Sequence, residues 1–200
     1  MATVAIIDYG AGNTRSVFYA LQRLGVAAVI TSDPQEIQAA ERVIFPGVGQ
    51  AASAMERLQE QGLDTLIPTL TQPVLGVCLG LQLMCSHTDE GNIPGMRIFD
   101  ARVYHFRKGG EATASLRIPH MGWNSVASRG SRLLRGVDDG TFFYFVHSYY
   151  AETAPRTTAV TEYGIPFSAV MEHDNFFATQ FHPEKSGPAG EKVLQNFLTF

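Results

Sequence analysis

The first half of the chain alternates between short apolar runs and stretches with helical periodicity. The apolar runs show no polar alternation, which is typical of strands buried on both faces. They are VAIIDYG, VAAVIT, RVIFPGVG and PVLGVC, beginning at residues 4, 26, 42 and 73. Helices are expected between them over residues 14–24, from residue 34, over 51–61 and over 63–70. Strands that alternate with helices predict an α/β fold with a mainly parallel sheet covered on both faces.

Residues at the ends of these segments support the helix assignments. Asn13 can cap the first helix, and Gly25 can end it. Asp33 followed by Pro34 is the order expected at the first turn of the second helix. A further helix is expected over residues 79–90, LGLQLMCSHTDE, directly after the fourth apolar run.

The second half of the chain is richer in strands. Strand-like segments are RIFDARVYHF, TFFYFVHSYYAE, TTAVTEYG, FSAVMEHD and FFATQFHPE, which start at residues 97, 141, 157, 167 and 176. Turn signals such as Tyr163-Gly164 and Asp174-Asn175 separate several of them, which predicts antiparallel or mixed additions to the sheet. An amphipathic helix closes the sequence, and Ser186 or Gly187 would begin it. Its docking face would carry Val193, Leu194, Phe197 and Leu198.

Composition and charge narrow the classes of function. A chain of 200 residues, 45% hydrophobic and 17% charged, predicts one domain over residues 1–200. A net charge of −4 offers no basic surface to a nucleic-acid backbone. Residues 65–88 carry no charge, but their prolines, glycines and glutamines argue against a membrane span. The opening MATVAIIDYG reads as a strand rather than a secretion signal, and two cysteines suit a reducing compartment, so a cytoplasmic protein is expected.

The segment GVCLGLQ, residues 76–82, places a cysteine between a predicted strand and a predicted helix. Gly76 and Gly80 flank Cys78 in the G-x-nucleophile-x-G pattern of a nucleophile elbow. Such a turn forces the nucleophile into strained backbone and leaves no room for a nearby Cβ. The N–H groups and positive dipole end of the following helix would stabilise a thiolate. A lone free cysteine is more often buried packing, and it is this context that favours the nucleophile.

A nucleophilic cysteine requires a base, and the base requires a group that orients it. His182 follows a predicted strand, and Glu184 comes two residues later. On extended backbone, residues two apart point the same way, so the carboxylate can reach one imidazole nitrogen. The segment FPGVG, residues 45–49, could place a backbone N–H over the nucleophile as part of an oxyanion hole. Taken singly, each of these two segments is better read as ordinary structure.

Together FPGVG, GVCLGLQ and FHPE resemble the class I glutamine amidotransferases in order and spacing over most of the chain. The resemblance implies a three-layer, flavodoxin-like α/β fold with a mainly parallel central sheet and antiparallel strands in the second half. It implies Cys78 as nucleophile, His182 as base and Glu184 as the acid that orients it. The implied oxyanion hole is Val48 or Gly49 with Leu79. The implied contacts to glutamine are Gly47, Gln82, Glu90, Ser148 and Tyr149.

A narrower resemblance rests on PHMGWN at residues 119–124 and YFVHSYY at 144–150, with YGAGN and HPEKSG. These strings are similar to those of family members that supply ammonia to a separate (β/α)8-barrel cyclase subunit in histidine biosynthesis. The resemblance therefore implies glutamine as substrate and such a cyclase as heterodimer partner. The implied partner-facing residues are Asn13, Trp123, Tyr144 and Lys185. No signature covers residues 108–115, to which no role is assigned.

Other interpretations of these residues remain open. Trp123 could equally belong to the core, and His147 is better read as a satisfied core histidine than as a catalytic one. No metal or other cofactor is expected, because the remaining histidines lack cysteine or carboxylate partners at ligand spacing. The alternative functions are a glutaminase serving another synthase, for example a chorismate-utilising one, a catalytically silent docking subunit, and more distantly a cysteine peptidase. The intact Cys78, His182 and Glu184 argue against the silent subunit.

Overall fold

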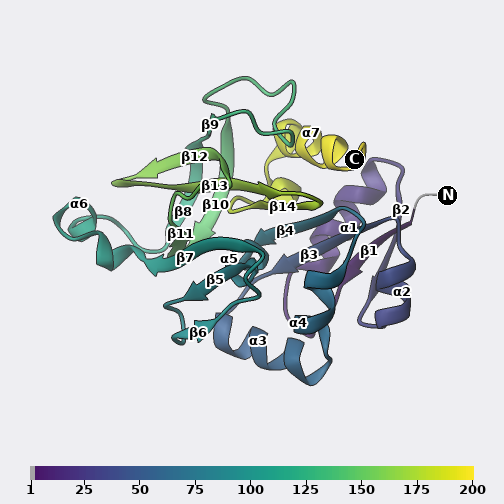
Figure 1. Cartoon of the computed structure of the whole chain (residues 1–200). Helices are drawn as coiled ribbons and strands as arrows, with labels where there is room; N and C mark the ends of the chain where they lie inside the picture. The colour runs from purple at the N-terminus through teal and green to yellow at the C-terminus, as the bar shows by residue number, and fades with distance from the viewer. Residues whose placement is uncertain (1–2) are drawn as a thin grey trace.

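An eight-stranded sheet forms the centre of the molecule in the computed structural model, which describes residues 3–200 (Figure 1). Residues 1 and 2, the start of the predicted domain and of MATVAIIDYG, lie outside the described residues. Five neighbouring strands of the sheet run parallel, which confirms the mainly parallel α/β architecture. In sheet order they are β2 (Ala27–Thr31), β1 (Thr3–Ile7), β3 (Arg42–Gly47), β4 (Val74–Cys78) and β14 (Phe176–Thr179).

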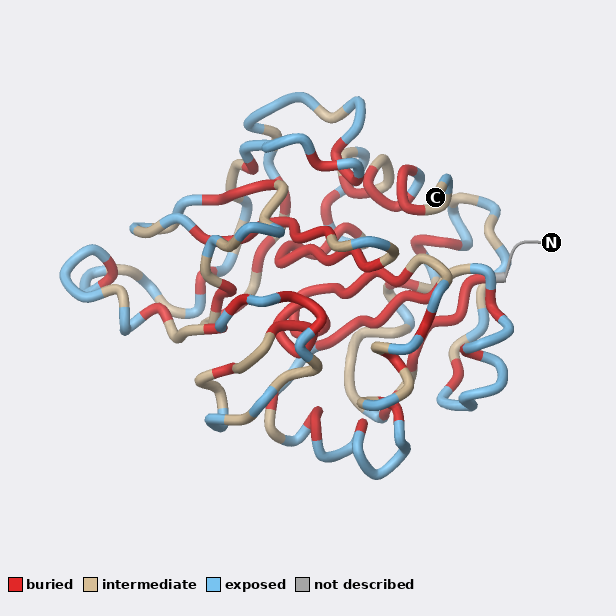
Figure 2. The backbone as a smooth tube through the Cα atoms, in the orientation of Figure 1, coloured by how far each residue is buried: buried red, intermediate tan, exposed pale blue. Residues whose placement is uncertain are grey.

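Helices cover both faces of this sheet. On one face α1 (Thr14–Arg23) and α7 (Gly187–Phe197) bury their apolar sides in a common hydrophobic cluster. On the other face α2 (Pro34–Ala39), α3 (Ala51–Glu60) and α4 (Leu63–Leu66) contribute to a second cluster, and the 3-10 turn η1 (Ile67–Thr69) follows α4. Figure 1 shows α7 and α3 on opposite sides of the sheet, and Figure 2 shows the buried strands between them. The predicted three layers are therefore present.

The helix ends follow the signals in the sequence. The Asn13 side chain accepts a hydrogen bond from the Ser16 N–H at 3.3 Å, and Asp33 accepts one from Gln35 at 2.8 Å. Ser186 precedes α7, whose Val193 is fully buried. The hydrogen bonds to Asn13 and Asp33 satisfy N–H groups that a helix leaves without an internal partner.

The second half extends the central sheet with antiparallel strands, as expected. Next to β14 lie β13 (Ile165–His173), β12 (Thr157–Tyr163) and the edge strand β9 (Ala127–Ser128). The β12–β13 turn is at Gly164, with φ of +69°, and the β13–β14 turn is at Asp174, with φ of +52°. Both predicted turns are therefore confirmed.

Two smaller sheets complete the fold and were only partly foreseen. One pairs β8 (His120–Ser125) with β10 (Phe142–His147). The other has the order β11 (Tyr149–Ala151), β7 (Phe99–His105), β5 (Cys85–Thr88) and β6 (Ile93–Pro94). The aromatic run predicted as one strand from residue 141 is thus divided at Ser148 into strands of different sheets. Between β7 and β8 the chain forms the 3-10 turn η2 (Phe106–Gly109) and the short α6 (Glu111–Ala114).

The helix predicted over residues 79–90 is wrong beyond residue 84. Helix α5 covers Leu79–Met84, and Cys85 turns to extended backbone with φ −70° and ψ 173°. Cys85–Thr88 form β5, which pairs with both β6 and β7. Strand pairing on both sides outweighs the helical periodicity of a six-residue continuation. In the described part of the chain, no helix has the length and apolar character needed to cross a membrane.

Candidate active site

The strand β4 turns sharply into α5 at Cys78. The φ of Cys78 is +54° with ψ of −105°, a conformation that non-glycine residues rarely adopt. A Cβ added at Gly80 would lie 2.2 Å from the Phe45 carbonyl oxygen, and one at Gly76 would lie 2.7 Å from the Met84 sulfur. The glycines on either side of the cysteine therefore allow α5 to pack directly on β3 and β4, as a nucleophile elbow requires.

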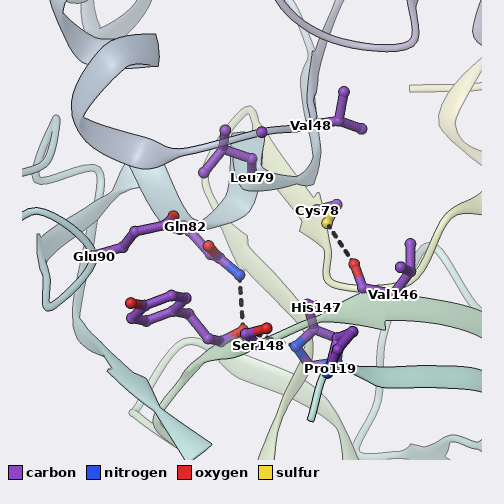
Figure 3. Close-up of a pocket in the computed structure, with 11 residues that line it drawn as sticks. Val48, Cys78, Leu79, Gln82, Glu90, Pro119, Val146, His147 and Ser148 are labelled. Atoms are coloured by element: carbon purple, nitrogen blue, oxygen red, sulfur yellow. Dashed lines mark hydrogen bonds between the residues drawn. The ribbon is translucent and has the colours of Figure 1, made fainter.

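A cavity of about 270 Å³ opens beside Cys78 (Figure 3). It gathers residues from the loop after β3, the elbow, α5, the loop after β5 and the junction of β10 with β11. Its lining is Val48, Gly49, Cys78, Leu79, Gln82, Glu90, Pro119, Val146, His147, Ser148 and Tyr149. Seven of these eleven residues are ones that the sequence assigned to the oxyanion hole or to glutamine contacts, and an eighth is Cys78 itself. Gly47 does not line the cavity; a Cβ there would meet the Gly80 nitrogen and the Leu79 Cβ, each at 2.7 Å.

His182 and Glu184 are in contact at the end of β14. The Nδ1 atom of His182 lies 2.8 Å from Oε1 of Glu184, and both side chains are almost completely buried. Residues 183–185 form a 3-10 turn, η3 (Pro183–Lys185), rather than the extended backbone from which the contact was predicted. The carboxylate fixes the ring and leaves Nε2 buried, without a hydrogen-bond partner among residues 3–200.

The electrostatic surroundings of His182 favour the imidazolium. Burial lowers its pKa, but the negative charge of Cys78 and the contact with Glu184 outweigh burial and raise the pKa to about 10. The arrangement therefore supports a thiolate–imidazolium pair with a carboxylate on the far side of the ring.

Gln180 is a site residue that the sequence analysis missed. It is fully buried, and its Nε2 donates a hydrogen bond of 3.5 Å to the Cys78 sulfur. The sulfur also lies 3.9 Å from the Val146 carbonyl oxygen, which could accept a hydrogen bond only from the protonated thiol. The one signal for Gln180 in the sequence was its position two residues before His182, although β14 ends at Thr179 and residues 180 and 181 form a bend.

The Gln82 side chain connects Gln180 to the opposite wall of the cavity. Its Nε2 donates to the Tyr149 carbonyl oxygen at 2.9 Å and to Oε1 of Gln180 at 3.0 Å. Across the cavity, Glu90 accepts a hydrogen bond of 2.9 Å from the Ala51 N–H at the start of α3. Burial raises the pKa of Glu90, and that hydrogen bond opposes the rise. A cationic group of a ligand beside this carboxylate would stabilise its charged form.

Three of the four predicted partner-facing residues form one surface cluster. Trp123 is 54% exposed, so it is not a core residue, and its ring meets Tyr144 edge to face at 6.2 Å. The Lys185 ammonium lies 5.9 Å from the centre of the Tyr144 ring. Met121 and Phe142 were not predicted, yet both are more than half exposed on the same face of the β8–β10 pair. Asn13, the fourth, caps α1.

His147 is buried, and both of its ring nitrogens are hydrogen-bonded. It is the satisfied core histidine that was expected, although it also lines the cavity. Within residues 3–200, no three His, Cys, Asp or Glu side chains are grouped so that they could hold a metal ion.

Comparison with known proteins supplies independent information. A model of the family described as "Glutamine amidotransferase class-I" matches residues 5–199. The chain is 54% identical over 197 residues to "Imidazole glycerol phosphate synthase subunit HisH" of Bacteroides fragilis (strain YCH46), and 48% identical over 197 residues to the protein of the same name from Yersinia pestis. Each alignment covers 98% of both proteins.

Solved structures share the fold at low sequence identity. A glutamine amidotransferase of known structure matches with a TM-score of 0.74 at 17% identity, covering 98% of this chain and 97% of that one. PurLQS from Thermotoga maritima matches with a TM-score of 0.72 at 16% identity, again covering 98% of this chain and 97% of that one.

Proposed function

Because the chain belongs to the class I glutamine amidotransferase family, we propose that it is the glutaminase subunit of an imidazole glycerol phosphate synthase. In this role it hydrolyses glutamine to glutamate and ammonia and passes the ammonia to a cyclase subunit. The single observation that carries the catalytic assignment is the elbow at Cys78, beside the buried His182–Glu184 pair and a cavity of suitable size for an amino acid. The near full-length identity to subunits of that name supports the choice of synthase.

The proposed reaction begins with attack of the Cys78 thiolate on the carboxamide carbon of glutamine. Backbone N–H groups of Gly49, or Val48, and of Leu79 stabilise the oxyanion; one such donor is worth about 3 kcal/mol. His182 gives its proton to the leaving nitrogen, so the C–N bond breaks and ammonia departs from a thioester. His182 then takes a proton from water, which attacks the thioester and releases glutamate and the thiolate. Throughout, Glu184 holds the ring by Nδ1 and stabilises its positive charge.

The cavity offers groups suited to the rest of the substrate. Glu90 would bind the α-ammonium group, which also offsets the cost of its own burial. Gln82, Ser148 and Tyr149 would contact the polar backbone of the amino acid. Gly47 would act indirectly, because its lack of a Cβ allows the loop after β3 to approach α5.

Ammonia in water near neutral pH is mostly ammonium, which is not a nucleophile, so the product must pass directly to an acceptor. The exposed cluster of β8 and β10 contains Met121, Trp123 and Phe142, and exposed apolar and aromatic side chains of this kind are typical of protein interfaces. We assign it to docking of a (β/α)8-barrel cyclase, with Trp123, Tyr144, Lys185 and Asn13 as the residues in contact. That partner would bind phosphoribulosyl-formimino aminoimidazole carboxamide ribonucleotide. It would yield imidazole glycerol phosphate and aminoimidazole carboxamide ribonucleotide.

We further infer that the chain is a single domain and acts in the cytoplasm. One sheet contains strands from both halves of the sequence, and both cysteines are buried and free of disulfide bonds, in keeping with a reducing compartment. The loop at Gly47-Val48-Gly49 would complete the oxyanion hole only when the partner docks.

A glutaminase assay with and without the cyclase and its ribonucleotide tests this function. We expect weak hydrolysis by the chain alone and a large rise in kcat/KM when both are added. Full activity of the isolated chain would contradict the coupling. Glutamine hydrolysis near the wild-type rate by Cys78→Ala would contradict the catalytic assignment.

A further inference from the structure

Two buried histidines outside the catalytic set, His120 and His147, are joined by a direct hydrogen bond. Nδ1 of His120 lies 3.0 Å from Nε2 of His147, and the two residues are only 4% and 6% exposed. His120 belongs to β8, which carries the exposed Trp123, and His147 ends β10 and lines the glutamine cavity. The pair therefore spans the distance between the proposed docking face and the proposed substrate site.

The neighbours of the pair fix which nitrogen carries each proton. A carbonyl oxygen can only accept, so Nδ1 of His147 must donate to the Tyr149 carbonyl, at 2.7 Å. Burial lowers the pKa of His147 to about 3 and that of His120 to about 4, so both rings are neutral at physiological pH. A neutral imidazole has one donor and one acceptor. Nε2 of His147 therefore accepts from Nδ1 of His120, whose own Nε2 must accept from a third group.

That third group is Asn124, next to Trp123 in β8. Its Nδ2 donates to Nε2 of His120 at 3.2 Å and to the Glu162 carbonyl oxygen at 2.9 Å, while its Oδ1 accepts from the Ser125 N–H at 2.8 Å. A surface groove of about 490 Å³ exposes this end of the network, between Trp123, Asn124 and the end of β12. Each hydrogen bond from Asn124 to the Tyr149 carbonyl therefore has a single possible direction, with the donor on the Asn124 side.

The inner end of the network reaches the nucleophile. The same Tyr149 carbonyl oxygen accepts from Gln82, which also donates to Gln180, which donates to the Cys78 sulfur. Five side chains and the Tyr149 carbonyl thus link the docking face to Cys78 through six hydrogen bonds of 2.7 to 3.5 Å. No catalytic step described above uses His120 or His147.

Packing holds the His120 ring in a single orientation. The ring stacks on Tyr163 at 4.1 Å with an interplanar angle of 24°, and on Phe145 at 5.1 Å with an angle of 28°. A shift of β8 cannot therefore be absorbed by rotation of the ring, and the hydrogen bonds must transmit it. A fully satisfied buried network specifies one arrangement more strictly than apolar packing does.

We propose that His120 and His147 are positioning residues that transmit docking at the β8 face to the glutamine cavity. A partner seated against Trp123 displaces Asn124 and His120, and His147 then moves the Tyr149 carbonyl that holds Gln82. The proposal rests on the proposed function for the identity of the partner. It differs from that function in assigning the coupling to two particular residues.

The test compares wild type with His120→Phe, which keeps the aromatic stack and removes both nitrogens. The readout is the ratio of glutaminase kcat/KM at saturating cyclase and ribonucleotide to that of the chain alone. We expect the ratio to fall at least about fivefold, within the range of ordinary coupling energies. The basal rate should stay within about threefold, since His147 keeps its bond to Tyr149. Asn124→Ala, which removes the outer donor near the surface, should lower the ratio in the same direction if His120→Phe folds poorly.

His87→Phe is the matched control, because it removes a half-buried imidazole from β5 that is absent from both the cavity and the groove. Its ratio should equal that of wild type. A stimulated wild type with an unchanged ratio in both His120→Phe and Asn124→Ala would overturn the coupling alone. A wild type that the cyclase does not stimulate would overturn the proposed partner as well. NMR of ¹⁵N-labelled histidine should find both rings protonated at Nδ1, and an Nε2–H form of either ring would overturn the network itself.

Discussion

The elbow at Cys78 depends on direct contact between α5 and the backbone of β3, and Gly80→Ala breaks that contact. The added Cβ would lie 2.2 Å from the Phe45 carbonyl oxygen, where the shortest tolerated approach is 3.0 Å, so the helix must move by at least 0.8 Å. The obstructing atom belongs to the backbone of a fully buried strand residue, so it cannot turn aside. Overpacking of this kind costs about 1–3 kcal/mol of folding stability.

The same movement displaces the Leu79 N–H, a proposed oxyanion donor. Loss of one such donor costs about 3 kcal/mol in the transition state, which corresponds to a fall in kcat/KM of roughly 100-fold or more. The assay is steady-state glutamine hydrolysis at a temperature where circular dichroism shows that both proteins are folded. The effect should fall on kcat more than on KM, since the oxyanion exists only in the transition state.

Gly25→Ala is the control for this prediction. Gly25 ends α1 with a φ of +72° and has nothing within 4 Å of an added Cβ. Its substitution should cost about 1 kcal/mol of stability through backbone strain and leave kcat/KM unchanged. If Gly80→Ala retained kcat/KM within about threefold of wild type, the reasoning that the elbow geometry positions the oxyanion hole would be refuted.

Three further variants probe the base, the newly found amide and the docking face. Glu184→Gln should lower the raised pKa of His182, so the alkaline limb of the glutaminase pH profile should move from near pH 10 to lower pH. The pKa of His182 is higher in the folded state than in the unfolded state, so protonation of this ring stabilises the fold. The stabilisation is complete below about pH 6.5 and is lost as the pH rises through about 10. In Glu184→Gln the stability lost over this pH range should be smaller. Gln180→Leu should reduce kcat/KM about tenfold by removing the donor to the sulfur, and an unchanged value would show that the contact is only structural. Trp123→Ala should leave the unfolding temperature nearly unchanged but weaken cyclase binding about thirtyfold by calorimetry, since buried aromatic anchors contribute about 2 kcal/mol.

The first half of the fold could be predicted because β1, β3 and β4 are buried on both faces, whereas the edge strand β2 is partly exposed and was recognised from its apolar sequence. In the run from Val74 to Cys78 every residue is buried, so hydrophobicity alone marks the strand. The helix ends at Asn13 and Asp33 carry their own local signals. Interactions that are local in sequence determine these features, and a single sequence contains them.

The errors lie where distant pairing decides the structure. Residues 85–88 continue a helical pattern, but they pair with β7, which lies more than ten residues later. The strand β8 contains Gly122, Trp123 and Asn124, which have little in common with a regular strand pattern, and it forms by pairing with β10. The break at Ser148 is likewise set by two different partner sheets.

The candidate site divides in the same way. Cys78 with its two glycines, and His182 with Glu184, are close in sequence and could be paired by spacing. Gln180 gave no chemical signal of its own, because an amide becomes informative only when its neighbours are known. The exposure of Met121 and Phe142 depends on which face of the β8–β10 pair is covered.

The central claim is that Cys78 releases ammonia that reaches the partner without entering bulk water. The most direct measurement uses glutamine labelled with ¹⁵N in its amide, together with the cyclase, its ribonucleotide and an excess of unlabelled ammonium. We expect imidazole glycerol phosphate to carry the label almost completely, and Cys78→Ala to yield only unlabelled product. A product whose label is diluted by the added ammonium, or one that Cys78→Ala still labels, would contradict the claim.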